Sequence, residues 1–328
     1  MTVGRGLETE LRSRLRGISV RSVSLRDYGI VFTVVLLCVV LSLASPVFLT
    51  PTNILNILDQ NTPVAIIAIA GTFVIIGGSF DLSVGAIFAL SGAIAAIVAN
   101  SYGTVPGLAA GMVTGCLIGI VNGLLVTVGR IHSFIATIAT QTVVYGLAQV
   151  ITGGYLITVS DPSFAVLGNA SLAGIHDTVW VFLAVAVAGW FLLVRTSYGR
   201  YVFAIGGNQE AARFSGIRVN LLRATTFAMS GLASGLAGVL VASRISQGEP
   251  GSGTDLTLTA IASIVIGGTS IMGGEGAVWR TLLGVLLLAL IGNGFNLLNF
   301  STTYQQMAQG LIIIGAVSVD AWSGRSRR

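Results

Sequence analysis

Long apolar runs follow one another along most of the chain, and short polar or glycine-containing segments separate them. The runs are continuously apolar, whereas the strands of a membrane β-barrel are short and alternate apolar with polar positions. Because backbone groups in lipid must pair within the protein, the runs are predicted to be helices. Ten are expected, over residues 28–43, 63–76, 82–99, 105–128, 134–152, 178–194, 224–243, 256–272, 278–298 and 304–319. The predicted fold class is an all-α polytopic membrane protein with ten transmembrane helices.

Charged residues are too scarce for a water-soluble domain. Of the 328 residues, 54% are hydrophobic and 9% are charged, against about a quarter charged in an average soluble protein. All 17 basic residues are Arg, and a Walker A phosphate loop needs a Lys to reach the phosphates of the nucleotide. The chain is therefore not expected to be a P-loop ATPase by itself.

The positions of the Arg residues predict the orientation, because cytoplasmic loops of membrane proteins hold the excess of positive charge. If the N-terminus is inside, every Arg except Arg244 falls in a cytoplasmic segment, and the outer segment 153–177 contains two Asp and no Arg. Both termini are thus expected in the cytoplasm. The predicted organisation is a cytoplasmic tail over residues 1–27, a transmembrane domain over 28–320 and a second cytoplasmic tail over 321–328.

Glycines at four-residue spacing predict close helix packing, within one subunit rather than between subunits. They are Gly107, Gly111, Gly115, Gly119 and Gly123 in one run, and Gly231 and Gly235 in another. Residues 76–79 also resemble residues 266–269, and Asn122-Gly123 resembles Asn293-Gly294. Inverted repeats of transporters give such similarities, and so does chance in a glycine-rich chain.

The runs carry little ionisable chemistry. No run has a carboxylate at its centre, which disfavours an ion-coupled transporter. No catalytic motif is present, and the two Cys and two His stand alone, so neither an enzyme nor a metal or cofactor site is expected. The candidates for a path that an uncharged polyhydroxylated solute follows are the amides of Asn122, Gln141, Asn293 and Asn296. Hydrogen bonding between helices is the alternative role of each.

The cytoplasmic loop 195–223 is too apolar for a solvated loop. Within it, Asn208 is a good N-cap for a short helix over residues 209–215, with Glu210 in its first turn. Gly216 is the expected left-handed residue after the helix. With small Ala211 and Ala212 on its surface, this helix is predicted to dock into a soluble partner.

The same loop resembles the coupling loop of ribose-type permeases, the membrane subunits of bacterial ABC importers for simple sugars. The similar residues run from Gly199 through Gly206, Gly207 and Asn208 to Ile217. Further stretches agree in order and spacing, namely 129–137, Asn293-Gly294 with 304–306, and signature residues that include Asp81, Ser83, Gly85, Gly267 and Gly268. The resemblance covers roughly residues 28–320. One departure is Thr257, which stands where this family commonly has an acidic residue.

The resemblance implies a type II ABC importer-like permease in the bacterial plasma (inner) membrane. It implies three protein partners besides membrane lipid: a cytoplasmic ABC ATPase, a periplasmic or extracellular solute-binding protein, and a second permease copy or a paralogue. No nucleic acid is expected. The coupling residues would be Gly206, Gly207, Asn208, Glu210, Ala211, Ala212 and Gly216. The solute would be a simple sugar or a similar small polar molecule. Alternatives are a permease for branched-chain amino acids, nucleosides or an autoinducer-type furanosyl compound, and, less favoured, a secondary transporter.

Overall fold

The computed structural model describes residues 25–325, and nearly all of its regular structure is helical. The helices are α2 (Leu25–Ala44), α3 (Pro51–Ile76), α4 (Val84–Tyr102), α5 (Thr104–Thr127), α6 (Ser133–Thr152), α7 (Val166–Asn169), α8 (Asp177–Arg195), α9 (Ser197–Gly207), α10 (Gln209–Phe214), α11 (Val219–Ile245), α12 (Thr254–Ile266), α13 (Val278–Leu297) and α14 (Thr302–Arg325), with a 3-10 turn η1 (Pro162–Ala165). Four two-residue strands form two antiparallel pairs: β1 (Ile157–Thr158) with β4 (Gln247–Gly248), and β2 (Ser171–Leu172) with β3 (Ile175–His176).

Each of the ten predicted apolar runs lies on a helix, and the all-α membrane fold is confirmed. In the part of the chain that the structure describes, seven helices are long and apolar enough to cross a membrane: α3, α4, α5, α6, α8, α11 and α13. Two further apolar helices are shorter in the described residues: Gly29–Ala44 of α2, and α12, which has 13 residues and ends at Ile266, six residues before the end of the predicted run. The count of ten spans and the cytoplasmic termini stay predictions. Residues 1–24 and 326–328 of the two predicted tails lie outside the described residues.

Helix α3 begins at Pro51, although the sequence places the start of this span at residue 63. The Thr50 hydroxyl caps the helix by accepting a hydrogen bond from the Asn53 amide, and Pro51 occupies the first turn, where no amide donor is needed. The polar residues before Pro63 therefore lie on a helix, and Asn53 and Thr62 among them are buried. Asn61 and Thr62 donate to carbonyls of α3 itself, whereas Asn53 and Asp59 pair with Asn293 of α13 and Arg244 of α11, and these distant partners could not be read from the sequence.

Helix α5 packs closely against α4 and α11. A Cβ atom on Gly115 would overlap the Gly231 carbonyl oxygen, and one on Gly231 would overlap the Gly115 carbonyl oxygen. A Cβ atom on Gly111 would likewise lie 2.6 Å from the Ser91 carbonyl oxygen of α4. The glycine ridge thus packs inside one subunit, as predicted, because only glycine lets two helix backbones approach this closely.

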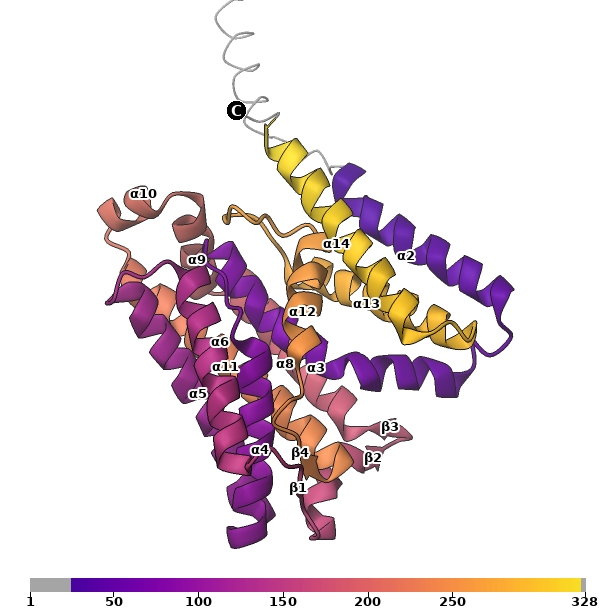
Figure 1. The fold of residues 1–328 in the computed structure, drawn as a ribbon. Coiled ribbons are helices and arrows are strands. Elements are labelled where there is room, and N and C mark those ends of the chain that lie inside the picture. The colour runs from indigo at the N-terminus through magenta and orange to yellow at the C-terminus, as the bar shows by residue number, and fades with distance from the viewer. Residues whose placement is uncertain (1–24, 326–328) are drawn as a thin grey trace, which may run out of the picture.

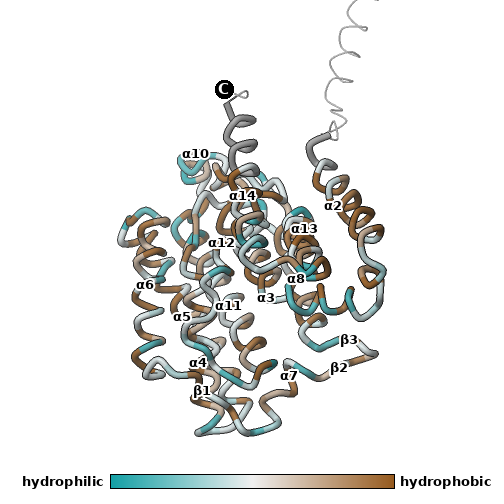
Figure 2. Tube along the Cα trace, turned by 45° about the vertical axis from the view of Figure 1, so that its right-hand side comes forward, coloured by the Kyte–Doolittle hydropathy of each residue, from teal (hydrophilic) through white to brown (hydrophobic). Residues whose placement is uncertain are grey.

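The two ends of the bundle differ in charge and structure. Helix α10 lies at one end and the four short strands lie at the opposite end (Figure 1). Loops and helix ends at the α10 end carry Arg130, Arg195, Arg213 and Arg218. Between the ends, the outer helices such as α2 are predominantly hydrophobic, whereas α10 is hydrophilic (Figure 2). This distribution suits a helical bundle in a membrane whose α10 end faces the cytoplasm.

We predict that Gly115→Ala lowers the thermal unfolding midpoint of the detergent-purified protein. The methyl group meets backbone atoms of α11 that cannot rotate away, and such overpacking costs about 1–3 kcal/mol. Gly146→Ala on α6 is the matched control, because nothing lies within 4 Å of a Cβ atom there. The thermal midpoint of Gly146→Ala should be the same as that of the unchanged protein or higher. Equal midpoints for the two variants would contradict the packing argument.

Candidate functional site

The predicted docking helix is present as α10, with the predicted caps. The Asn208 side chain accepts a hydrogen bond of 2.9 Å from the Ala211 amide, which satisfies one of the free donors of the first turn. Gly216 follows the helix in the left-handed conformation, with a φ of +82°. Glu210, Ala211 and Phe214 are exposed, the last with 90% of its surface accessible. This face is available to a partner.

Ala212 points the other way. Its side chain is 4% exposed and packs with Ile205 of α9 and Val219 of α11. Ala212 therefore holds α10 onto the bundle, whereas the exposed residues Glu210 and Ala211 form the outward face. A bulky side chain at position 212 would disturb the loop itself before it reached a partner.

Helix α9, which the sequence predicted only as part of the loop, anchors α10 to the bundle. Thr196 caps it by accepting a hydrogen bond from the Gly199 amide. The Tyr198 hydroxyl lies 3.1 Å from the Thr225 hydroxyl of α11. Burial raises the pKa of Tyr198, so this hydroxyl stays neutral. The apolar positions 202, 203 and 205 were the sequence signal for an amphipathic helix here.

The end of α9 meets two other chain segments at a junction made of glycines. A Cβ atom on Gly206 would overlap the Ile76 carbonyl oxygen at the end of α3, and would lie 2.5 Å from the Gly274 amide. A Cβ atom on Gly273, which has a φ of +84°, would lie 3.1 Å from the Cα atom of Gly78. The Gly274 amide donates to the Ile76 carbonyl at 2.9 Å. Helix α10 is thus mechanically joined to α3 and to the segment 267–277.

Helices α3 and α12 end in the same way. After α3, the Gly78 amide donates to Ile75 and the Ser79 amide to Val74. After α12, the Gly268 and Thr269 amides make the corresponding bonds, and Gly78 and Gly268 both have a positive φ. This is the Schellman motif, in which a left-handed glycine ends the helix. The sequence similarity of residues 76–79 and 266–269 therefore corresponds to a shared local structure.

The turn between α3 and α4 is not helical, and side chains from other helices satisfy its backbone. The Phe80 amide donates to the Ser133 hydroxyl at 3.1 Å, and the Leu82 amide donates to the Thr137 hydroxyl at 3.0 Å. Two nitrogens of the Arg223 guanidinium donate to the Ser79 hydroxyl, at 3.2 and 2.9 Å. Non-helical backbone is tolerated inside a membrane protein only where it is paired in this way.

Three of the signature residues have structural roles in this turn. The Asp81 carboxylate accepts from the Ser83 amide at 3.0 Å and from its hydroxyl at 2.6 Å. Gly85 lies so close to the Gly253 carbonyl that a Cβ atom would overlap it. Thr257, the departure from the family pattern, accepts a hydrogen bond from the Gly85 amide at 3.1 Å. A neutral hydroxyl thus ties α12 to the start of α4.

The four candidate path residues do not lie together. Asn122 is fully buried and donates to the Ser83 hydroxyl at 2.7 Å, so it belongs to the turn between α3 and α4. Gln141 lies half-buried on α6. Asn293 and Asn296 of α13 line a separate pocket of about 170 Å³. The structure therefore brings together only the last two.

The polar part of this pocket's lining consists mainly of amides from α3, α13 and α14, beside apolar side chains. Asn293 exchanges two hydrogen bonds with Asn53, of 3.1 and 2.8 Å, and Asn296 is exposed. The polar lining consists of Gln60, Asn61, Thr259, Asn293, Asn296, Gln305 and Gln309. Among the described residues that line it there is no charged side chain. Amides both donate and accept, so this lining can pair with the hydroxyl groups of a neutral solute.

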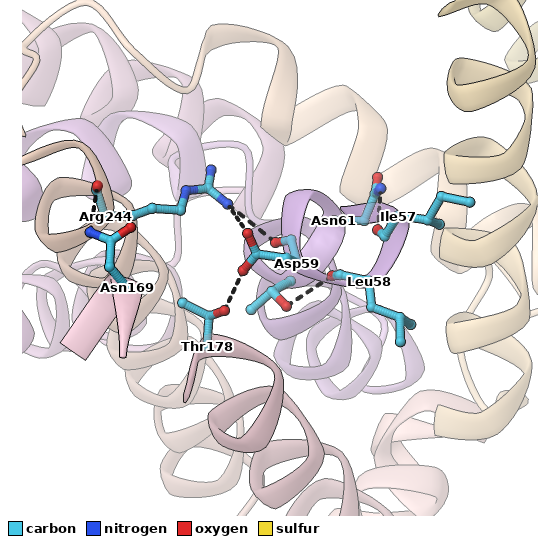
Figure 3. Close-up of polar contacts among 8 residues, drawn as sticks. Ile57, Leu58, Asp59, Asn61, Asn169, Thr178 and Arg244 are labelled. Atoms are coloured by element: carbon cyan, nitrogen blue, oxygen red, sulfur yellow. Dashed lines mark hydrogen bonds and ion pairs between the residues drawn. The ribbon is translucent and has the colours of Figure 1, made fainter. Parts of the chain in front are cut away.

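Arg244, the one outer Arg of the predicted topology, forms an ion pair with Asp59 (Figure 3). Its guanidinium lies 3.2 Å from the Asp59 carboxylate, which also accepts a hydrogen bond from Thr178 of α8. The same guanidinium donates to the Asp59 backbone carbonyl at 3.3 Å. Pro63 cannot donate to that carbonyl, four residues earlier, because proline has no amide hydrogen. Arg244 therefore replaces the donor that Pro63 lacks.

These features define a multi-pass helical protein of the membrane with an exposed, capped helix at one end. The family described as "Branched-chain amino acid transport system / permease component" matches residues 53–317. The chain belongs to this family. It is a multi-pass protein of the bacterial inner membrane, as the sequence predicted.

Relatives with stated names are similar over nearly the whole length. The ribose import permease protein of Haemophilus influenzae is 40% identical over 298 residues, which is 89% of this chain and 92% of the relative. That of Bacillus subtilis is 43% identical and covers 87% and 89% of the two chains. The L-arabinose ABC transporter permease protein of Azospirillum brasilense is 38% identical and covers 92% and 89%. No solved structure matches.

Proposed function

We propose that this chain is the membrane-spanning permease subunit of an ATP-driven, binding-protein-dependent importer of a simple sugar. The observation that carries the proposal is the exposed, capped helix α10 and its seat on the glycine junction of Gly206, Gly78 and Gly274. The ribose and arabinose permeases among the relatives support the solute class. The chain itself would perform no covalent chemistry, and a partner ATPase would supply the energy.

Coupling would work through the junction. In the proposed orientation, with ten spans and both termini inside, a cytoplasmic ATPase docks on Glu210, Ala211 and Phe214. Its movement on ATP binding shifts α9 and α10 as one unit, since Ala212 is packed against Ile205. At Gly206 the backbone of α9 is in direct contact with the backbone of Ile76 and Gly274. A shift of α9 would therefore also displace the end of α3 and the segment that follows α12. ATP binding would then bias the equilibrium between outward-facing and inward-facing conformations.

The solute would pass the amide pocket between α3, α13 and α14, in the half of the bundle that faces outside in the proposed orientation. There it would arrive from an external solute-binding protein, and a second permease copy or a paralogue would complete the path. The lining favours a neutral polyol over an amino acid, the main competing solute. An amino acid zwitterion brings an ammonium and a carboxylate group, and burying such charges without charged partners is costly.

Uptake into proteoliposomes tests the function. We predict that the permease, reconstituted with its cognate ATPase and solute-binding protein, accumulates radiolabelled ribose or arabinose only when ATP reaches the ATPase, and that a protonophore has no effect. Uptake without ATP that a protonophore abolishes would instead identify a secondary transporter. Uptake of leucine but of neither sugar would identify an amino acid permease.

Gly206→Ala tests the coupling path. The added methyl group overlaps the Ile76 carbonyl oxygen, so the junction must open. We predict that this variant still co-purifies with the ATPase but loses at least about nine tenths of the uptake, the effect of a change of about 1.4 kcal/mol in the conformational equilibrium. Gly207→Ala is the matched control, because nothing lies within 4 Å of a Cβ atom there. Normal uptake by Gly206→Ala would rule out the junction as the coupling path.

Glu210→Arg tests the docking face separately. Because it reverses the charge of an exposed residue proposed to contact the ATPase, this variant should no longer co-purify with the ATPase.

The variants Asn296→Leu and Asn122→Leu distinguish an asparagine that contacts the solute from one that stabilises the packing of the helices. Asn296 is exposed in the pocket, so its replacement should lower uptake several-fold, about 1 kcal/mol for one lost hydrogen bond, and leave the thermal midpoint unchanged. Asn122→Leu should lower the midpoint because the buried Ser83 hydroxyl loses its donor. Unchanged uptake with Asn296→Leu, or an equal loss of midpoint in both variants, would argue against a solute role for the pocket.

A further inference from the structure

A large cavity lies beside α10, at the end of the bundle that carries most of the Arg residues. Its volume is about 850 Å³, and its walls are the end of α5, the loop to α6, one side of α10 and the start of α11. The basic side chains that line it are Arg130, His132, Arg213, Arg218 and Arg223. Among the described lining residues there is no carboxylate. The cavity therefore concentrates positive charge from three separate segments of the chain.

The guanidinium groups have little to pair with inside the protein. Arg223 is committed to the Ser79 hydroxyl. Within residues 25–325, the guanidinium groups of Arg130, Arg213 and Arg218 make neither an ion pair nor a hydrogen bond, and all three residues are exposed. Guanidinium groups present forked donors that match phosphate oxygens. A cavity lined by several guanidinium groups suits an anion that carries a phosphate group.

Apolar side chains continue from the cavity along the bundle. Ile131 and Leu221 line the cavity itself and are 39% and 57% exposed. Next to them along the chain, at the facing ends of α5 and α6, Val128, Phe134 and Ile135 are exposed at 73%, 48% and 63%. A soluble anion gains nothing from this apolar surface, whereas the acyl chains of a lipid would cover it.

Helix geometry separates this cavity from the docking face of α10. Gln209 and Arg213, four residues apart, lie on the same side of the helix and line the cavity. Glu210, Ala211 and Phe214 point to other sides, at about 100° per residue. A partner on the docking face thus leaves the cavity open toward the periphery of the bundle, where α5 and α6 expose their apolar side chains.

We propose that this cavity binds the headgroup of an anionic phospholipid of the phosphatidylglycerol type, with its acyl chains along α5 and α6. Basic pockets at the cytoplasmic ends of transmembrane helices suit such headgroups. The bound phosphate would bridge the loop between α5 and α6 to α10 and α11, and so would hold the docking helix in place. The leaflet follows from the proposed orientation, but binding itself does not depend on the proposed transport function.

The test uses the delipidated full-length permease alone, without uptake. Added phosphatidylglycerol should raise its thermal midpoint and remain bound in native mass spectrometry, whereas phosphatidylethanolamine with the same chains should do neither. Combined Arg130→Gln, Arg213→Gln and Arg218→Gln should weaken phosphatidylglycerol binding by about a hundredfold, given the contribution of each basic residue near a membrane. The single variants should each lose part of this and keep the test usable if the triple variant does not fold. Arg200→Gln, an exposed Arg on α9 outside the cavity, should bind like the unchanged protein.

Three results would overturn the proposal. Equal phosphatidylglycerol binding by the triple variant would mean that the lipid adheres elsewhere. Equal stabilisation by inorganic phosphate or glycerol 3-phosphate at matched concentration would identify a site for soluble anions. Loss of ATPase co-purification in the triple variant, with lipid binding unchanged, would assign the Arg residues to the ATPase surface.

Discussion

A backbone group inside a membrane must find its partner in the protein, because lipid offers none. This constraint explains the role of several polar side chains in the bundle. Ser133 and Thr137 pair with the turn after α3, and Arg244 supplies the donor that Pro63 cannot give. At both of these departures from a continuous helix, a hydroxyl or guanidinium from a distant segment compensates. These compensating contacts fix how the helices are placed relative to one another.

A helical bundle in lipid must also pack closely, because lipid supplies no hydrophobic driving force between helices. Glycine allows this close packing because it has no side chain. On α5 the glycines let the backbone approach α4 and α11. At the α10 end, Gly206 and Gly274 bring three chain segments together. The first contact lies between membrane-spanning helices, and the second lies beside the helix that is proposed to dock to a partner. One residue type therefore serves both packing and the proposed transmission of movement.

Charged side chains have different roles in different parts of the bundle. Arg244 of α11 and Asp59 of α3 form an ion pair that joins these two helices. At the α10 end, Arg130, Arg213 and Arg218 make no such pair within the described residues and face an open cavity. The amide pocket is polar but carries no charge in its described lining. A neutral solute can pass such a surface without a strong electrostatic trap.

The sequence by itself determined the helical membrane class, the family, the caps of α10 and the role of the glycine ridge, because all depend on local pattern and residue type. Tertiary structure alone decided what each polar residue does. Asn122 and Asn296 look alike in sequence, yet one pairs with Ser83 in the core and the other is exposed in a pocket. The start of α3 at Pro51 was equally hidden. A polar residue is stable inside a membrane only with its partner, and the partners here lie far away in the chain.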